Sequence, residues 1–202
     1  MSRLQRISRL HDYFAQNGYR HFGEGEGQYG VPEAFRAITE QLRLPLEKWS
    51  VLDLGCGPGN LIEFAPFKKF TGVDLSPEML LQAGESGYNE LIEANMADYV
   101  ANPFTEAQDV VVALSCAYFL RPKEFAPFMR NVDRLAKRFW LVTLDGMTAS
   151  ARNVYEEQDD IDTYDHRGVA LPWPNVHRIT IKGWHSVATD EDIAMDVVYR
   201  LK

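Results

Sequence analysis

The stretch 51-VLDLGCGPGN-60 places three glycines, spaced two residues apart, directly after a run of apolar residues. Glycine has no side chain and loses more backbone entropy on folding than any other residue, so this cluster needs a structural reason. Residues 50–55 predict a buried strand, and residues 60–65 predict a short helix that ends before Pro66. The stretch therefore predicts a tight strand-to-helix turn whose bare backbone a ligand can approach closely.

Strands and helices alternate along the chain after this turn. Residues 69–75 predict a second strand, and the helix that follows has Ser76 as its N-cap and Pro77 as its first residue. Further strands are predicted over 90–98, 109–115, 138–146, 176–184 and 193–201, with a helix over 121–137. This order predicts an α/β fold. We expect a three-layer αβα sandwich around a seven-stranded, mostly parallel, doubly wound sheet with a C-terminal antiparallel hairpin strand.

The residues before the first strand predict two helices that form an N-terminal lid. Apolar residues recur at helical spacing between Leu4 and Phe14, and a second helix begins near Pro32. The link between them, residues 22–30, has four glycines in nine positions. Such a link predicts a loop rather than a continuous helix.

Composition and charge exclude several classes of protein. The chain has 202 residues, of which 46% are hydrophobic and 25% charged, as is typical of one globular domain. No apolar run reaches 18 residues, and the basic N-terminal segment lacks the apolar region of a signal peptide, so we expect no membrane partner. The net charge of −8 argues against a nucleic-acid partner. Two cysteines without a CxxC pair favour a cytoplasmic protein, and the five histidines show no metal-ligand spacing.

Three acidic residues fall at the carboxyl ends of predicted strands: Asp53, Asp74 and Asp98. In an open parallel sheet, ligands bind at these ends, where the strand order reverses. The dinucleotide fingerprint G-x-G-x-x-G would need a third glycine where this chain has Asn60. Three carboxylates are poor neighbours for a pyrophosphate and good neighbours for a cation. Taken alone, the glycines also fit an ordinary tight turn without a ligand.

The segments VLDLGCGPGN, GVDLSPEML and EANMAD, in this order, resemble the class I S-adenosylmethionine-dependent methyltransferase family. The resemblance covers residues 49 to about 145, and the terminal hairpin by topology. It implies a Rossmann-like enzyme that uses S-adenosylmethionine and releases S-adenosylhomocysteine. A single domain, 1–202, is then expected to divide into a lid (1–48), a cofactor-binding core (49–146), a variable acceptor-side insertion (147–175) and the hairpin (176–202).

The resemblance also implies a role for each matching position. Asp53 would lie near the ammonium group of the cofactor, Asp74 would accept hydrogen bonds from the ribose, and Asp98 would accept one from the adenine amino group. Leu75 and Met79 would pack against the adenine. The expected cofactor contacts are Asp53, Gly55, Cys56, Gly57, Gly59, Asp74, Leu75, Met79, Asn95, Met96, Ala97, Asp98, Leu114 and Ser115.

The residues on the acceptor side follow from position and chemistry. Methyl transfer depends mainly on alignment, and it needs a general base only for a weak, protonated acceptor such as a phenol or an alcohol. The aromatic residues of the lid and the insertion suit a flat or apolar small molecule, although they also suit simple packing. The candidate catalytic residues are Tyr118, Asp145, His21 and His166, and the candidate substrate contacts are Tyr13, Tyr19, Tyr29 and Tyr118.

These observations predict a cytoplasmic enzyme, monomeric or homodimeric, that methylates an oxygen or nitrogen atom of a small molecule. One alternative is a methyltransferase for a protein or a tRNA. The acidic balance and the sequence ALSCAYFL (113–120), found where an Asn-Pro-Pro-Tyr signature would stand, argue against it. A second alternative is a regulatory domain that binds the cofactor without catalysis.

Overall fold

The glycine-rich turn follows the carboxyl end of an inner strand of a seven-stranded sheet. The computed structural model describes residues 1–16, 30–146, 161–186 and 191–202. The strand order is β3-β2-β1-β4-β5-β7-β6, in which β7 is antiparallel to both of its neighbours and the other four pairs are parallel. This confirms the predicted fold class. The strands are β1 (Ser50–Leu54), β2 (Lys69–Asp74), β3 (Glu90–Glu93), β4 (Gln108–Ala113), β5 (Ala136–Asp145), β6 (His177–Ser186) and β7 (Glu191–Leu201).

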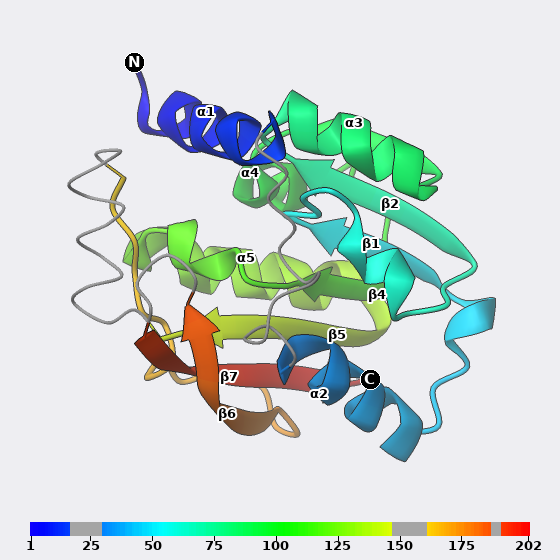
Figure 1. Cartoon of the computed structure of the whole chain (residues 1–202). Coiled ribbons are helices and arrows are strands. Elements are labelled where there is room, and N and C mark those ends of the chain that lie inside the picture. The colour runs from blue at the N-terminus through cyan, green and yellow to red at the C-terminus, as the bar shows by residue number, and fades with distance from the viewer. Residues whose placement is uncertain (17–29, 147–160, 187–190) are drawn as a thin grey trace.

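Helices cover both faces of this sheet, as Figure 1 shows. On one face, Val51 and Val110 pack with Phe35 of α2 (Gly30–Gln41) and Leu80 of α3 (Pro77–Ser86). The other face is covered by α4 (Met96–Ala101) and α5 (Pro122–Leu135). The first helix, α1 (Arg3–Gln16), lies beside α3. Three short 3-10 helices complete the described elements: η1 (Leu46–Lys48), η2 (Asn60–Glu63) and η3 (Ala117–Phe119).

The start and end of α3 follow the sequence prediction. The Ser76 hydroxyl oxygen accepts a hydrogen bond from the Met79 amide at 3.0 Å, and Pro77 occupies the first helical turn. Gly87 ends the helix with a φ of +106°, a conformation that an L side chain rarely adopts. The N-cap at Ser76 therefore fixes the direction in which the chain leaves β2.

Two predicted elements differ from the structure. The strand predicted over 90–98 ends at Glu93, because the Asn95 side chain accepts hydrogen bonds from the amides of Ala97 (2.8 Å) and Asp98 (3.1 Å) and so caps α4. The helix predicted over 60–65 is the 3-10 helix η2, four residues long. Between β1 and β2, where every residue is described, the turn is thus not followed by an α-helix.

The N-terminal lid and the insertion are only partly described. Both lid helices, α1 and α2, are present, whereas most of the predicted glycine-rich link lies outside the described residues. Residues 161–176 of the insertion form a loop without helix or strand, and residues 147–160 lie outside the described ranges. Within those ranges, no helix combines the length and the apolar character needed to cross a membrane.

Candidate functional site

The three glycines after β1 all have positive φ angles, of +69° (Gly55), +52° (Gly57) and +88° (Gly59). A Cβ atom on Gly55 would lie 2.7 Å from the Cβ of Cys116, and one on Gly59 would lie 2.9 Å from a ring carbon of Tyr88. A Cβ on Gly57 would meet nothing within 4 Å. Two of the glycines therefore let the turn pack against the protein, while Gly57 leaves its backbone open to a ligand.

Two adjoining cavities open at the carboxyl ends of β1, β2 and β4. The larger has a volume of about 200 Å³ and the smaller of about 50 Å³, and both are lined by His11, Gly55, Asp74 and Cys116. Every predicted cofactor contact except Gly59 lines at least one of them. The larger cavity has Leu75, Asn95, Met96, Ala97 and Asp98, and the smaller has Asp53, Cys56, Gly57, Met79, Leu114 and Ser115.

Asp74, at the end of β2, ties the glycine-rich turn to the start of α3. One carboxylate oxygen accepts a hydrogen bond from the Gly57 amide at 2.9 Å, and the other accepts one from the Ser76 amide at 2.9 Å. The residue is 6% exposed and lines both cavities. Since a carboxylate oxygen has two lone pairs, each oxygen keeps one position for a ligand donor.

Asp53 is the buried acid of the smaller cavity, and Tyr88 holds it in place. The Tyr88 hydroxyl donates to an Asp53 carboxylate oxygen at 2.5 Å. Burial raises the pKa of Asp53 to about 7; the Tyr88 hydrogen bond opposes this rise, and the charge of Asp74 adds to it. The Tyr88 ring also lies against Gly59 and Gly72, where a Cβ would approach it within 2.9 and 2.8 Å.

Sequence reasoning missed Tyr88 because nothing in its neighbourhood forms a motif. It stands alone between the helix-ending Gly87 and Asn89, just before β3. Tyr88 lies beside the glycine-rich turn only because β2 pairs in parallel with both β1 and β3. The glycine at position 72, in the middle of a strand, was the one available signal that a bulky group lies close by.

His11 is a second residue that was not among the predicted cofactor contacts. It lines both cavities from α1, and its ring contacts Phe119 edge-on with centroids 5.3 Å apart. Burial lowers the pKa of His11, while the nearby carboxylates of Asp74 and Asp12 oppose this shift. Helical periodicity predicted α1 itself, but not which part of the sheet it would cross.

Three of the hydrogen bonds made by α1 tie it to the loop after β2 and to α3. The Ser8 hydroxyl donates to the Leu75 carbonyl oxygen at 2.9 Å, and the Ser76 hydroxyl donates to Asp12 at 2.6 Å. At the end of the helix, the Gln82 amide donates to the Ala15 carbonyl oxygen at 2.9 Å. The lid helix is thus fixed to the same loop that carries Asp74.

Asp145 ends β5 and is 2% exposed. Among the described residues, neither of its carboxylate oxygens has a hydrogen-bond partner. Burial raises the pKa of Asp145 to about 7; the charge of Asp165 adds to this rise, whereas Arg167 opposes it. The Ser115 hydroxyl lies close enough to lower the pKa, yet neither side chain finds a partner at hydrogen-bond geometry.

Asp145 lines neither of the two cavities, and the other described candidates on the acceptor side do not line them either. Tyr118 packs in an apolar cluster with Ile7, Leu10 and Ile161. The His166 ring stacks on Phe125 at 4.2 Å with a ring nitrogen 2.9 Å from the Leu120 carbonyl oxygen, and burial lowers its pKa. Tyr13 is 60% exposed. The remaining candidates, His21, Tyr19 and Tyr29, lie outside the described residues.

Known proteins share part of the sequence of this chain and its fold. A family model described as a methyltransferase domain matches residues 51–138, which run from the glycine-rich turn into β5. Magnesium protoporphyrin IX methyltransferase from Synechocystis PCC 6803, solved with bound S-adenosylhomocysteine, superposes with a TM-score of 0.61. That alignment covers 96% of this chain and 99% of the other at 17% identity. Over residues 51–138 the chain is thus similar to a methyltransferase domain, and over nearly its whole length it shares the fold of this solved structure.

Other methyltransferases resemble shorter parts of the chain. A trans-aconitate 2-methyltransferase from Rhodopseudomonas palustris (strain BisA53) is 52% identical over 92 residues, or 43% of this chain. One from Mycobacterium tuberculosis (strain ATCC 25177 / H37Ra) is 34% identical over 95 residues, or 45% of this chain. Each alignment spans 34% of the relative's own length. The similarity is therefore concentrated in one part of each relative.

Within the described ranges, no three His, Cys, Asp or Glu side chains lie together in a way that could hold a metal ion. The described chemistry of this candidate site is that of carboxylates, backbone amides and apolar side chains around two joined cavities.

Proposed function

We propose that this methyltransferase transfers a methyl group from S-adenosylmethionine to a small-molecule acceptor. The observation that carries the proposal is the pair of cavities that meet at Gly55 and Asp74, to whose lining Asp53, Asp74 and Asp98 contribute carboxylates. When bound, the cofactor supplies a methyl group on a positively charged sulfonium. Carboxylates around the site lower the energy of that cation and of the cofactor's ammonium group.

The backbone of the turn also favours a cation over a dinucleotide. A pyrophosphate needs free amides and the N-terminus of a helix. Here the Gly57 amide donates to Asp74, and η2 is a single 3-10 turn without the aligned dipoles of a longer helix. The Gly57 amide is thus already engaged within the protein, and the N-terminus of η2 offers only a weak dipole to a phosphate.

The two cavities match the two ends of the proposed cofactor. We assign the adenine to the larger cavity, against Leu75 and Met96, with Asp98 at its exposed rim. We assign the methionine arm to the smaller one, between Asp53 and Leu114. Asp74 lines both cavities, so it is the residue suited to the ribose that joins the two ends.

A small molecule is the acceptor class that the comparisons support. The relatives with similar sequence are named for trans-aconitate, a small molecule, although the alignments cover a third of their length. The net charge of −8 gives no basis for binding tRNA. We also propose a cytoplasmic location, since Cys56 and Cys116 are both free.

Calorimetric titration with S-adenosylhomocysteine and with NAD⁺ tests the proposal. We expect S-adenosylhomocysteine to bind and to raise the thermal midpoint, because a ligand that binds only the folded state stabilises it. NAD⁺ should do neither. Stabilisation by NAD⁺ with no effect of S-adenosylhomocysteine would contradict the proposed function.

A further inference from the structure

Two arginines line the larger cavity, Arg3 in α1 and Arg121 directly before α5. The Arg3 guanidinium donates from Nη2 to the carbonyl oxygens of Phe119 at 2.6 Å and of Asp162 at 2.9 Å. Its Nε is buried without a hydrogen-bond partner, and no carboxylate of the described residues forms an ion pair with it. Since a guanidinium carries five N–H donors, Arg3 keeps donors for a further acceptor.

The Arg121 guanidinium donates no hydrogen bond to the described residues. One of its nitrogens lies 3.8 Å from a Glu124 carboxylate oxygen, which is beyond hydrogen-bond distance. The other oxygen of Glu124 accepts a hydrogen bond from the backbone amide of Arg121 at 2.8 Å. The Glu124 carboxylate therefore serves the backbone at the start of α5, and the guanidinium remains available to a ligand.

The two guanidiniums lie close together, and we call Arg3 and Arg121 the arginine pair. The Phe119 carbonyl oxygen that accepts from Arg3 stands only two residues before Arg121. Burial lowers the pKa of Arg3 and the charge of Arg121 lowers it further, while Glu124 and Asp162 are among the groups that oppose this shift. Like charges that are partly removed from water repel each other, so the arrangement is costly until an anion joins it.

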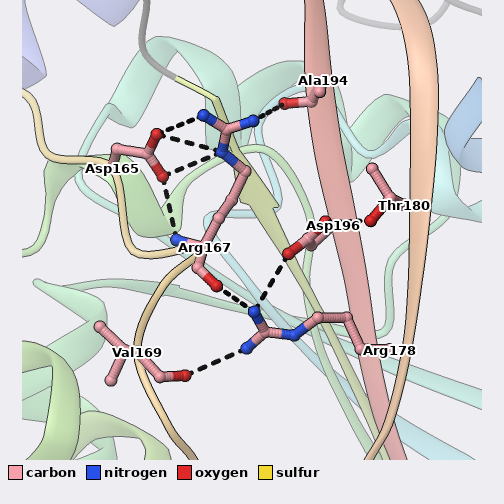
Figure 2. Close-up of polar contacts among 7 residues, drawn as sticks. All are labelled: Asp165, Arg167, Val169, Arg178, Thr180, Ala194 and Asp196. Atoms are coloured by element: carbon pink, nitrogen blue, oxygen red, sulfur yellow. Dashed lines mark hydrogen bonds and ion pairs between the residues drawn. The ribbon is translucent and has the colours of Figure 1, made fainter.

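Arginines on the far side of β5 show the pairing that the arginine pair lacks (Figure 2). Arg167 donates to both carboxylate oxygens of Asp165, and Arg178 donates to a carboxylate oxygen of Asp196 at 3.2 Å. Neither of these two arginines lines either cavity. Guanidiniums that lie away from the cavities are thus matched by carboxylates within the protein, whereas those of the larger cavity face a space that a ligand can enter.

The proposed cofactor contacts do not use this part of the larger cavity. The residues that we assign to the adenine, Leu75, Met96 and Asp98, come from the loop after β2 and from α4. The arginine pair comes from α1 and from the start of α5. The larger cavity meets the smaller one at Gly55 and Asp74, where the proposed sulfonium would lie between the ribose and the methionine arm. A molecule held by the arginine pair therefore shares one continuous space with the sulfonium.

We propose that the arginine pair binds a carboxylate of the methyl acceptor, so that the acceptor is an organic acid. A guanidinium presents its N–H donors as a planar fork that matches the two oxygens of a carboxylate. A single negative charge also suits this cavity better than the two charges of a phosphate, because Asp98 and Glu124 line it as well. This inference rests on the proposed function and names the substrate class of that site.

Calorimetric titration of the full chain saturated with S-adenosylhomocysteine tests the binding. The probes are benzoate, phenylacetate, succinate, glutarate and citrate; the uncharged controls are benzamide, phenylacetamide, succinamide and glutaramide, and inorganic phosphate is the competing anion. We expect at least one acid to bind about 10-fold more tightly than its amide and than phosphate. Binding of no acid, equal binding of acids and amides, or tighter binding of phosphate would overturn the inference.

Substitutions of the arginine pair locate the binding. Arg121→Gln removes a guanidinium that donates no hydrogen bond to the described residues, so the melting curve should not change. Affinity for the acid that binds best should fall about 10-fold, while affinity for S-adenosylhomocysteine stays as in the wild type. Arg130→Gln, an exposed position of α5 that lines neither cavity, is the matched control and should bind the acid normally.

Arg3→Gln should weaken binding of the acid in the same way. This variant also loses the contacts of α1 with Phe119 and Asp162, so its melting curve is recorded beside that of Arg9→Gln, an exposed position of the same helix. Unchanged affinity for the acid in both Arg3→Gln and Arg121→Gln would contradict the assignment.

Radiolabelled S-adenosylmethionine then shows whether the bound acid is an acceptor. We expect label in an acid of the set and in none of the amides; label in an amide alone would count against the proposed substrate class. Binding of S-adenosylhomocysteine in the same preparations separates the two levels of the account. If it does not bind, the proposed function fails, whereas if it binds and no acid does, only this inference fails.

Discussion

The two ends of the site differ in how far their polar groups are paired within the protein. Around the glycine-rich turn, Asp74 holds two backbone amides and Asp53 holds the Tyr88 hydroxyl. At the end of β5, both oxygens of Asp145 lack a partner among the described residues. The proposed cofactor end is thus organised by hydrogen bonds within the protein, whereas Asp145, which lines neither cavity, is not.

The largest expected effect comes from filling the open space at Gly57. Gly57→Val should lower the affinity for S-adenosylhomocysteine more than 100-fold, because its side chain would project into the smaller cavity. The positive φ adds a strain of roughly 1–2 kcal/mol, so the thermal midpoint should fall by only a few degrees. Calorimetric titration with a parallel melting curve measures both effects. Gly168→Val, where a side chain also meets open space, is the control and should bind normally.

Removing the carboxylate of Asp74 should have the next largest effect. Asp74→Ala loses the proposed ribose contacts and also frees the amides of Gly57 and Ser76. We expect the dissociation constant for S-adenosylhomocysteine to rise about 30-fold, which corresponds to ~2 kcal/mol. An unchanged constant would show that this acid organises the turn without touching the ligand. Asp74→Asn keeps a hydrogen-bond acceptor, so its dissociation constant should lie between those of the wild type and Asp74→Ala.

Tyr88→Phe should have a smaller effect that depends on pH. The variant keeps the ring against Gly59 and Gly72 but loses the donor to Asp53, so the pKa of Asp53 should rise above its value of about 7. A larger fraction of Asp53 is then protonated at pH 7, and affinity for S-adenosylhomocysteine should fall about 5-fold, from the loss of roughly 1 kcal/mol of charge-assisted interaction. Titrations between pH 6 and 9 measure this, and near-normal affinity should return at pH 9. A loss that is equal at every pH would point to packing alone.

The smallest expected effect is a gain in thermal stability, whereas the preceding variants lose affinity. The pKa of Asp145 is raised in the folded protein from 3.8 to about 7, so its ionisation opposes folding as the pH rises through that window. Asp145→Asn removes this penalty, and its thermal midpoint should exceed that of the wild type by a few degrees at pH 8. At pH 4 the two proteins should melt together, since Asp145 is protonated in the folded wild type. Melting curves at the two pH values measure the difference.

The arrangement of the glycine-rich turn and its neighbouring strand ends could be predicted from sequence because its motifs are local. The glycines, Asp53 and the cap at Ser76 all stand within a few residues of a strand end, and strand order alone brings such ends together. Tyr88 and His11 could not be predicted in the same way. Their positions depend on how far β3 and α1 extend and on which neighbours they cross, and these are properties of tertiary packing.

The acceptor end was harder to predict because its residues come from segments without a shared pattern. Asp145 was identified since it ends a strand, like the acids of the cofactor end. His166 and Tyr118 were chosen by residue type, and the structure shows the first stacked on Phe125 and the second in an apolar cluster. A residue type that is capable of catalysis does not itself indicate exposure to a cavity. Strand ends are the more informative signal in this fold.

The central claim is that the two cavities that meet at Gly55 and Asp74 hold the two ends of one cationic cofactor. A crystal structure of the protein with S-adenosylhomocysteine tests it most directly. We predict the adenine between Leu75 and Met96, the ribose hydroxyls on Asp74, and the amino group beside Asp53. A ligand that leaves the smaller cavity empty, or that makes no contact with Asp74, would contradict the account.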